Sequence, residues 1–388
     1  MPIINRVAAM QDEVAGWRRD FHAHPELGLE LERTAGLVAE RLRTFGCDEV
    51  ATGVGQTGVV GIIRGAKSGS GRVIGLRADM DALPIAEITG LPHASRTASR
   101  MHACGHDGHT AMLLGAARYL AETRNFDGTA VMIFQPAEET GAGALAMLGD
   151  GLMDRFGVQE VYGMHNMPGI PTGHFGVRSG PIMAAADRIQ ILIEGRGSHA
   201  AKPHLAIDPV LIGCQFGMAA QAIVARSVDP LDSAVVSITM FRGGDTFNVI
   251  PQSATLTGTV RSLDRKTRAL VFERLHTLAA ALGQQHGARL TISTGLGCPV
   301  TVNHEPQAAF AAKVATAVVG ADKVDTDVPP MMGGEDFSHM LEARPGAFVF
   351  IGNGNSEGLH HPGYDFDDAA IPAGVSFLAR LVEQGMQG

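Results

Sequence analysis

The segment MHACGHDGHTAML, residues 101–113, holds one cysteine and three histidines within eight residues, with glycines among them. Cys104 and His106 are two positions apart, and Gly105 between them lets the backbone bend so that both side chains can face one point. A thiolate and an imidazole together suit zinc or another late first-row divalent ion. A cysteine beside histidines is also typical of a nucleophile with a lowered pKa, or of simple packing. The segment by itself leaves all three readings open.

Further residues of ligand type follow apolar runs elsewhere in the chain, namely the pair Glu138-Glu139, His165 in MHN, and His360 or His361 in LHHPGYDF. Taken singly, the glutamate pair is typical of a solvated acidic loop, and each histidine is typical of a structural residue. A thiol protease does not need two adjacent carboxylates, whereas a hydrolytic metal site does. One carboxylate binds metal, and the other stays free to take a proton from the attacking water. The set as a whole favours a metal-dependent hydrolase.

The elements that must position these residues alternate along the first half of the chain. Two helices are predicted within residues 5–45, with a break at 22–28. Short Val/Ile/Leu-rich runs that end in polar residues then alternate with helical segments at 108–122 and 143–157; the runs lie at 59–65, 72–84, 128–139 and 160–168. This alternation predicts an α/β fold with a mostly parallel sheet and helices on both faces. Sites in such sheets gather beyond the carboxyl ends of the strands, where the candidate residues lie.

A second pattern begins near Ala184, with strands and helices in the order β-α-β-β-α-β, which is that of a ferredoxin-like unit. Helix and strand return after Gly297. The sequence therefore predicts a discontinuous catalytic domain, 1–183 and 297–388, with an inserted lid and dimerisation domain at 184–296. An edge strand and a helix of the inserted sheet are free to pair with a second copy, so we expect a homodimer or higher homo-oligomer.

Composition narrows the class of partner. The net charge is −9 over 388 residues, without a basic stripe, which argues against nucleic acid and favours a small-molecule substrate. No apolar run approaches the roughly 18 residues needed to cross a bilayer, and the N-terminal residues lack the pattern of a signal peptide. The four cysteines lie far apart, which suits reduced thiols. We therefore expect a cytoplasmic protein without a membrane partner.

Ten ordered segments over nearly the whole length resemble the amidohydrolase branch of the dinuclear zinc metallopeptidases. That branch includes hippurate hydrolases, bacterial N-acyl-amino-acid amidohydrolases and plant hydrolases of indole-acetyl amino acids. Chance agreement of ten segments in one order is negligible. The segments are RRDFHAHPELGLE, RADMDALP, MHACGHDGHTAML, FQPAEE, GMHNMPGIPTG, GRGSHAAKPH, FNVIP, GTVRS, MGGEDFSHM and LHHPGYDFDD.

The resemblance implies two divalent metal ions per subunit and Glu138 as the general base. His360 is preferred to His361 because the family's pattern places its ligand directly after a leucine, here Leu359. Mixed thiolate, imidazole and carboxylate ligands admit zinc, manganese, cobalt or nickel. The metal ligands implied are Cys104, His106, Glu139, His165 and His360.

One position departs from the wider superfamily. The segment matching RADMDALP supplies a histidine ligand there, and Asp79 stands in its place here. Asp79 and Asp81 then become candidates for residues that orient the ligands.

Three further roles follow from the resemblance alone. His199 of GRGSHAAKPH matches a histidine that related enzymes use against the substrate carbonyl, often across a dimer; a turn-capping role is its structural alternative. Asn248 and Arg261 resemble positions linked with the substrate carboxylate, which an arginine fork binds through two parallel bonds. A structural ion pair is the alternative for Arg261.

The leading hypothesis is a metal-dependent amidohydrolase that cleaves N-acyl amino acids of the hippurate type into a carboxylic acid and a free amino acid. A metallo-dipeptidase or carboxypeptidase of the same family is the alternative within this chemistry. A non-catalytic metal-binding protein and a thiol hydrolase with Cys104 as nucleophile are alternatives of other classes. The first of these is disfavoured because the general base Glu138 is present.

Overall fold

The computed structural model describes residues 3–387 and divides the chain into two compact units. The first unit comprises Met1–Ile182, Val302–Pro329 and Asp336–Gly388. The second comprises Met183–Thr301 and Pro330–Glu335. Each unit has a buried apolar core of its own.

The first unit is built on one eight-stranded sheet, in the order β1-β2-β4-β3-β5-β16-β6-β15. Neighbours among the central strands β4, β3, β5 and β16 pair in parallel, whereas β1, β2 and β4 pair antiparallel. The central strands are buried almost throughout, as expected of a sheet covered on both faces. The strands are β1 (Glu49–Val54), β2 (Gly58–Arg64), β3 (Val73–Asp79), β4 (Thr129–Gln135), β5 (Glu160–Met167), β6 (Phe175–Gly176), β15 (Val324–Asp325) and β16 (Gly346–Gly352).

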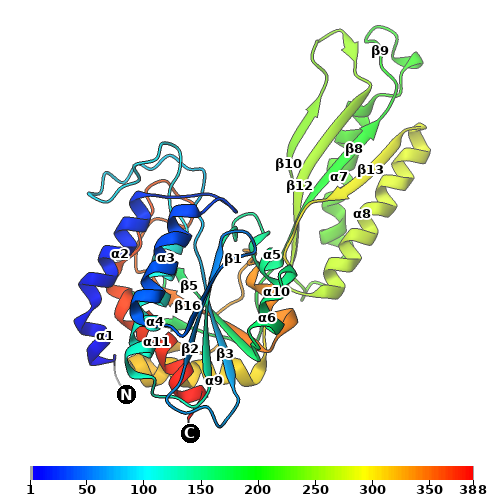
Figure 1. Ribbon diagram of the computed structural model, residues 1–388. Helices are drawn as coiled ribbons and strands as arrows, with labels where there is room; N and C mark the ends of the chain where they lie inside the picture. The colour runs from blue at the N-terminus through cyan, green and yellow to red at the C-terminus, as the bar shows by residue number, and fades with distance from the viewer. Residues whose placement is uncertain (1–2, 388) are drawn as a thin grey trace. The chain divides into compact units, whose positions relative to one another are not determined.

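Helices cover both faces of this sheet, with α2, α4 and α11 on one side and α5, α6 and α10 on the other (Figure 1). The predicted α/β fold with a mostly parallel sheet is confirmed. The first predicted helix is interrupted at Met10, so three helices precede β1 instead of two. The helices are α1 (Asn5–Ala9), α2 (Gln11–Ala23), α3 (Glu32–Phe45), α4 (His106–Thr123), α5 (Gly143–Gly149), α6 (Leu152–Arg155), α9 (Glu305–Val319), α10 (Phe337–Ala343) and α11 (Ile371–Gly385).

The second unit has the predicted element order β-α-β-β-α-β. Its four strands form an antiparallel sheet in the order β10-β12-β8-β13, and alternate residues of β8 are buried against the helices. Asp208 and Asp264 cap the N-termini of the two helices through their carboxylates. The elements are β8 (Ala185–Glu194), α7 (Pro209–Ser227), β10 (Ala234–Gly243), β12 (Ser253–Ser262), α8 (Arg265–His286) and β13 (Arg289–Thr294).

Judged by length and composition alone, helix α7 is long and apolar enough to cross a membrane. Of its 18-residue apolar stretch, 28% is buried. Ile212, Phe216, Ala220 and Ile223 of α7 belong to the core of the second unit. The core helix of a soluble protein passes the same test, so this one helix is weak evidence for a membrane span.

Candidate metal centre

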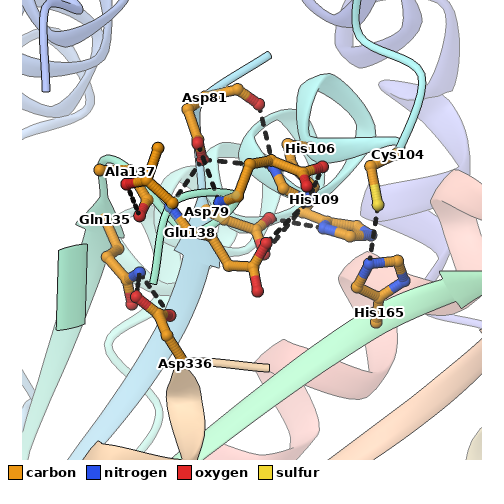
Figure 2. Close-up of polar contacts among 12 residues, drawn as sticks. Asp79, Asp81, Cys104, His106, His109, Gln135, Ala137, Glu138, His165 and Asp336 are labelled. Atoms are coloured by element: carbon orange, nitrogen blue, oxygen red, sulfur yellow. Dashed lines mark hydrogen bonds and ion pairs between the residues drawn. The ribbon is translucent and has the colours of Figure 1, made fainter. Parts of the chain in front are cut away.

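Ligand-type side chains from four segments of the first unit meet at one place. Cys104 precedes α4 and His106 begins it, Glu138 and Glu139 follow β4, His165 lies in β5, and His360 lies in the loop after β16. Figure 2 labels Cys104, His106, Glu138 and His165. Three groups of side chains overlap here, and within each group the possible ligand atoms lie within 4.8 Å of one another. The groups are Cys104–His106–His165, Cys104–Glu139–His360 and His106–Glu138–Glu139. The structure thus brings together every residue that the sequence resemblance suggested as a metal ligand, together with Glu138.

The parallel strands explain this convergence, because their carboxyl ends lie along one edge of the sheet. Asp79 ends β3, and the glutamate pair follows the end of β4. His165 differs from expectation, since it lies inside β5, opposite Phe350 of β16, instead of beyond the strand end. Strand β5 continues to Met167 because its pairing with β16 runs to that residue, whereas its pairing with β3 ends at Gly163.

Two imidazoles are oriented by backbone carbonyl groups. His106 Nδ1 donates to the carbonyl oxygen of Asp81 at 2.9 Å, and His165 Nδ1 donates to that of Asn166 at 2.6 Å. Because a carbonyl oxygen only accepts, Nε2 of each ring is the nitrogen directed to the site. His165 Nε2 lies 3.4 Å from Cys104 Sγ.

Two buried polar atoms at this place have no hydrogen-bond partner among residues 3–387: His106 Nε2 and Glu139 Oε1. They lie 3.9 Å apart, and His360 Nε2 lies 3.4 Å from the same glutamate oxygen. An unsatisfied buried polar group is costly, and a cation that both atoms contact would remove that cost. The residues present therefore fit a bound metal ion.

The electrostatics of the cluster also favour a cation. Although burial opposes it, the neighbouring Asp79 and Cys104 raise the pKa of His106 well above its usual range. The neighbouring Cys104 and Glu139 raise the pKa of His360 to about 10. When no metal is bound, the negative groups favour protonation of these two rings. Metal and protons therefore compete for the same nitrogens. Burial lowers the pKa of His165 well below its usual range, which keeps that ring in its neutral, ligating form.

Asp81 organises the glutamate pair. Its two carboxylate oxygens accept the backbone amides of Glu138 at 3.0 Å and Glu139 at 3.1 Å, while its carbonyl oxygen accepts from His106. One buried residue therefore fixes the backbone of both glutamates and the orientation of one imidazole. Glu138 Oε2 and Glu139 Oε1 each lie 3.9 Å from His106 Nε2.

Asp79 occupies the position where the wider superfamily has a histidine ligand. Its Oδ2 accepts from Arg77 at 2.7 Å, and its Oδ1 accepts from His109 Nδ1 at 2.6 Å. His109 Nε2 in turn accepts the backbone amide of Asn166 at 2.9 Å, directly beside His165. Burial would raise the pKa of Asp79, but His106 and Arg77 outweigh it and hold that pKa well below its usual range. Asp79 thus lies in a hydrogen-bonded network that reaches Asn166, next to the candidate ligand His165.

The remaining candidates lie in the second unit. His199 is exposed in the short strand β9 (Ser198–His199), and its Nδ1 accepts the amide of Ala201 at 3.0 Å, as in the turn-capping alternative. The carbonyl oxygen of Asn248 accepts the amide of Ala200 at 3.0 Å, so His199 and Asn248 lie on neighbouring segments.

Arg261 lies in β12, half-buried, where Nε donates to Thr259 at 3.1 Å and one terminal nitrogen lies 3.5 Å from the carbonyl oxygen of Met332. The structural ion pair that was its alternative does not occur within the described chain, residues 3–387. The assignment of Arg261 to the substrate carboxylate stays a prediction.

Known proteins resemble this chain over nearly its whole length. Residues 75–384 match the family described as Peptidase family M20/M25/M40. The chain belongs to this family. Hippurate hydrolase of Campylobacter jejuni is 41% identical over 98% of both chains, and N-acetyl-L-cysteine deacetylase of Bacillus subtilis is 40% identical over 96% of this chain and 88% of its own. A Bacillus subtilis protein described as a dinuclear metal binding peptidase of the M20 family superposes with a TM-score of 0.84, at 35% identity, over 97% of this chain and 98% of its own.

Membership of the M20 family makes this chain a hydrolase that acts on amide bonds. Sequence reasoning predicted no role for His109 or Asn166, although both stand beside predicted ligands. His109 was visible as the third histidine of the glycine-rich segment. The hydrogen bond between His109 and Asp79 could not be seen in the sequence, because the two residues are 30 positions apart and meet only in the fold.

Gly105 explains the small residues in the ligand-bearing segment. It has φ +84°, and a Cβ atom there would lie 2.1 Å from Asn166 Nδ2 and 2.6 Å from the Tyr364 hydroxyl oxygen. Asn166 donates from that same nitrogen to the carbonyl oxygen of Cys104 at 2.6 Å. Only glycine allows the chain to pass this close to β5.

We predict that Gly105→Ala destabilises the fold by about 1–3 kcal/mol and lowers metal content, because it combines a disfavoured φ with a clash at the ligand segment. Thermal unfolding and metal analysis measure both effects. Gly36→Ala in α3 is the control, since a Cβ atom there meets nothing within 4 Å and the residue has no positive φ. A Gly105→Ala protein with the stability and metal content of the wild type would contradict this view of the turn.

Proposed function

We propose that this protein is a metal-dependent amidohydrolase that cleaves N-acyl amino acids of the hippurate type. The observation that carries the proposal is the pair of adjacent glutamates whose backbone amides bond to Asp81 and whose carboxylates each lie 3.9 Å from His106 Nε2. One of the two can bind metal while the other moves a proton. The named activities of the hippurate hydrolase and N-acetylcysteine deacetylase relatives support the same substrate class.

We assign two divalent ions to the site, held by the five ligand-type residues of the cluster. Zinc, manganese, cobalt and nickel all suit the mixed donor set, in which the thiol of Cys104 is the softest donor. Such ions acidify water and polarise a carbonyl group when bound. The ligands proposed are Cys104, His106, Glu139, His165 and His360.

Glu138 acts as the general base in this proposal. Its carboxylate takes one proton from the attacking water, and the resulting hydroxide adds to the carbonyl carbon of the amide. The carbon–nitrogen bond then breaks, and Glu138 gives the proton to the departing amine. A carboxylic acid and a free amino acid are the products. We assign His199 to the developing oxyanion, and Asn248 and Arg261 to the substrate carboxylate.

The alternatives are weaker on specific grounds. Burial and the nearby Glu139 raise the pKa of the Cys104 thiol, whereas a nucleophilic cysteine needs a lowered pKa. A dipeptidase or carboxypeptidase would use the same residues, and differs in accepting a substrate with a free amine. Comparing hydrolysis of hippurate with that of a dipeptide of equal size separates the two.

Outside the active site, we propose that the second unit serves as lid and dimerisation domain. Exposed apolar side chains on its edge strand β10 and on α7 support pairing with a second copy; they include Leu211, Met218, Met240 and Phe241. We place the protein in the cytoplasm, where the free thiols of Cys47, Cys104 and Cys214 would stay reduced.

The two glutamates should separate on substitution. Glu138→Gln should keep the metal but lower hippurate hydrolysis by about 10²–10⁴, the usual worth of a general base. Glu139→Gln should lose metal. Metal analysis and initial rates on the metal-loaded proteins measure these effects, and chelation of the wild type should abolish activity. Metal loss in Glu138→Gln with retention in Glu139→Gln would reverse the two roles, and activity that survives chelation would point to thiol chemistry.

A mixed dimer tests the role of His199. We expect His199→Ala and Glu138→Gln each to be inactive, with His199→Ala keeping its metal. If His199 acts in the partner's site, subunit exchange between the two variants should restore activity, because one site of each mixed dimer then has both residues. Mass spectrometry of differently tagged chains verifies that subunits have exchanged. If activity does not recover after verified exchange, His199 does not act across the dimer.

A further inference from the structure

We propose that Arg18 and His22 of α2 are positioning residues that tie together the two loops carrying the metal ligands. The inference rests on the ligands assigned under Proposed function. Both residues belong to the segment RRDFHAHPELGLE, which the proposed reaction does not use. Both side chains are buried, and the acidic groups around them come from segments adjacent to the metal ligands.

Arg18 contacts both ligand-bearing segments at once. Its side chain is 1% exposed, and one terminal nitrogen lies 3.6 Å from Asp107 Oδ2 and 3.6 Å from Asp365 Oδ1. Its Nε donates to Asp368 Oδ1 at 2.8 Å. Asp107 directly follows His106, while Asp365 and Asp368 lie in the loop that follows His360. One guanidinium group therefore sets the position of the loop at α4 against that of the loop before α11.

His22 completes the tie on the side of α4. Its Nδ1 donates to Asp107 Oδ2 at 2.9 Å, and its Nε2 lies 3.4 Å from Glu87 Oε1. Glu87 also accepts the amide of Ser95 at 2.6 Å, within the stretch of chain that leads from β3 to Cys104. That stretch, residues 80–105, contains neither helix nor strand, so its path depends on such contacts.

The charges on α2 match this role. Burial alone would lower the pKa of His22, but Asp107 and Glu87 raise it to about 9, so the ring is positively charged at neutral pH. Arg18 and His22 thus present two buried cations to Asp107 and the neighbouring acids. Buried ion pairs gain little stability over apolar packing, but they fix geometry, since a displaced partner leaves an unpaired buried charge. This argues for positioning over simple stabilisation.

Arg19 provides a matched control on the same helix. It pairs with the same carboxyl group, Asp368, at 2.8 Å, but its side chain is 54% exposed. Arg19→Ala therefore removes a cation and one ion pair from α2 without removing the contact to Asp107.

The test is the rate at which zinc leaves the loaded protein in excess chelator. Arg18→Lys keeps the charge but loses the fork, and His22→Gln keeps a hydrogen-bonding side chain but loses the charge. We expect each to speed zinc release by about 10–100-fold, the usual effect of residues that orient ligands, while Arg19→Ala releases zinc at the wild-type rate. The rise in unfolding temperature on adding zinc should shrink in parallel.

The outcomes separate this inference from the function on which it rests. Variants that unfold at lower temperature without zinc, yet release zinc at the wild-type rate, would overturn the positioning role and leave a structural one. If Arg18→Lys does not fold, His22→Gln alone decides, since it removes no part of the contacts to Asp365 and Asp368. A wild-type protein that binds none of zinc, manganese, cobalt and nickel would instead overturn the metal site itself.

Discussion

The metal centre depends on the buried carboxyl group of Asp81. It accepts the backbone amides of both adjacent glutamates, and the carbonyl oxygen of the same residue accepts from His106. A carboxylate that accepts two amide hydrogen bonds is held in one orientation, and it holds the loop after β4 in turn. The loop that carries the two glutamates is therefore tied through both backbone amides to the residue that orients His106.

A second constraint is the network around Asp79. Arg77 and His109 occupy its two carboxylate oxygens, and His109 extends the network to Asn166 and so to β5. The sequence resemblance implies a histidine ligand at this position in the wider superfamily. Here the carboxylate lies 3.7 Å from His106 Nε2 and is already bonded on both oxygens. We interpret Asp79 as a group that orients the ligands, and Cys104 as the donor that completes the set.

Most of the fold was predictable from sequence because its signals are local. Apolar runs that end in polar residues marked β3 and β4, and the edge at which they end is where the ligands meet. The extension of β5 past His165 was not predictable, since it depends on pairing with β16, which lies far along the chain. The same holds for the site: its ligand types were visible, but the Asp79–His109 and Arg18–Asp107 contacts join residues that only the fold brings together.

The central claim is that the buried donors of this site bind two metal ions side by side. The most direct measurement is the anomalous diffraction of crystals grown with manganese, which locates each ion without reference to activity. The account predicts two peaks within the cluster of candidate ligands. Each ion should be contacted by at least one of Cys104, His106 and Glu139, the residues that belong to two of the three groups. A single peak, or peaks away from these three residues, would contradict it.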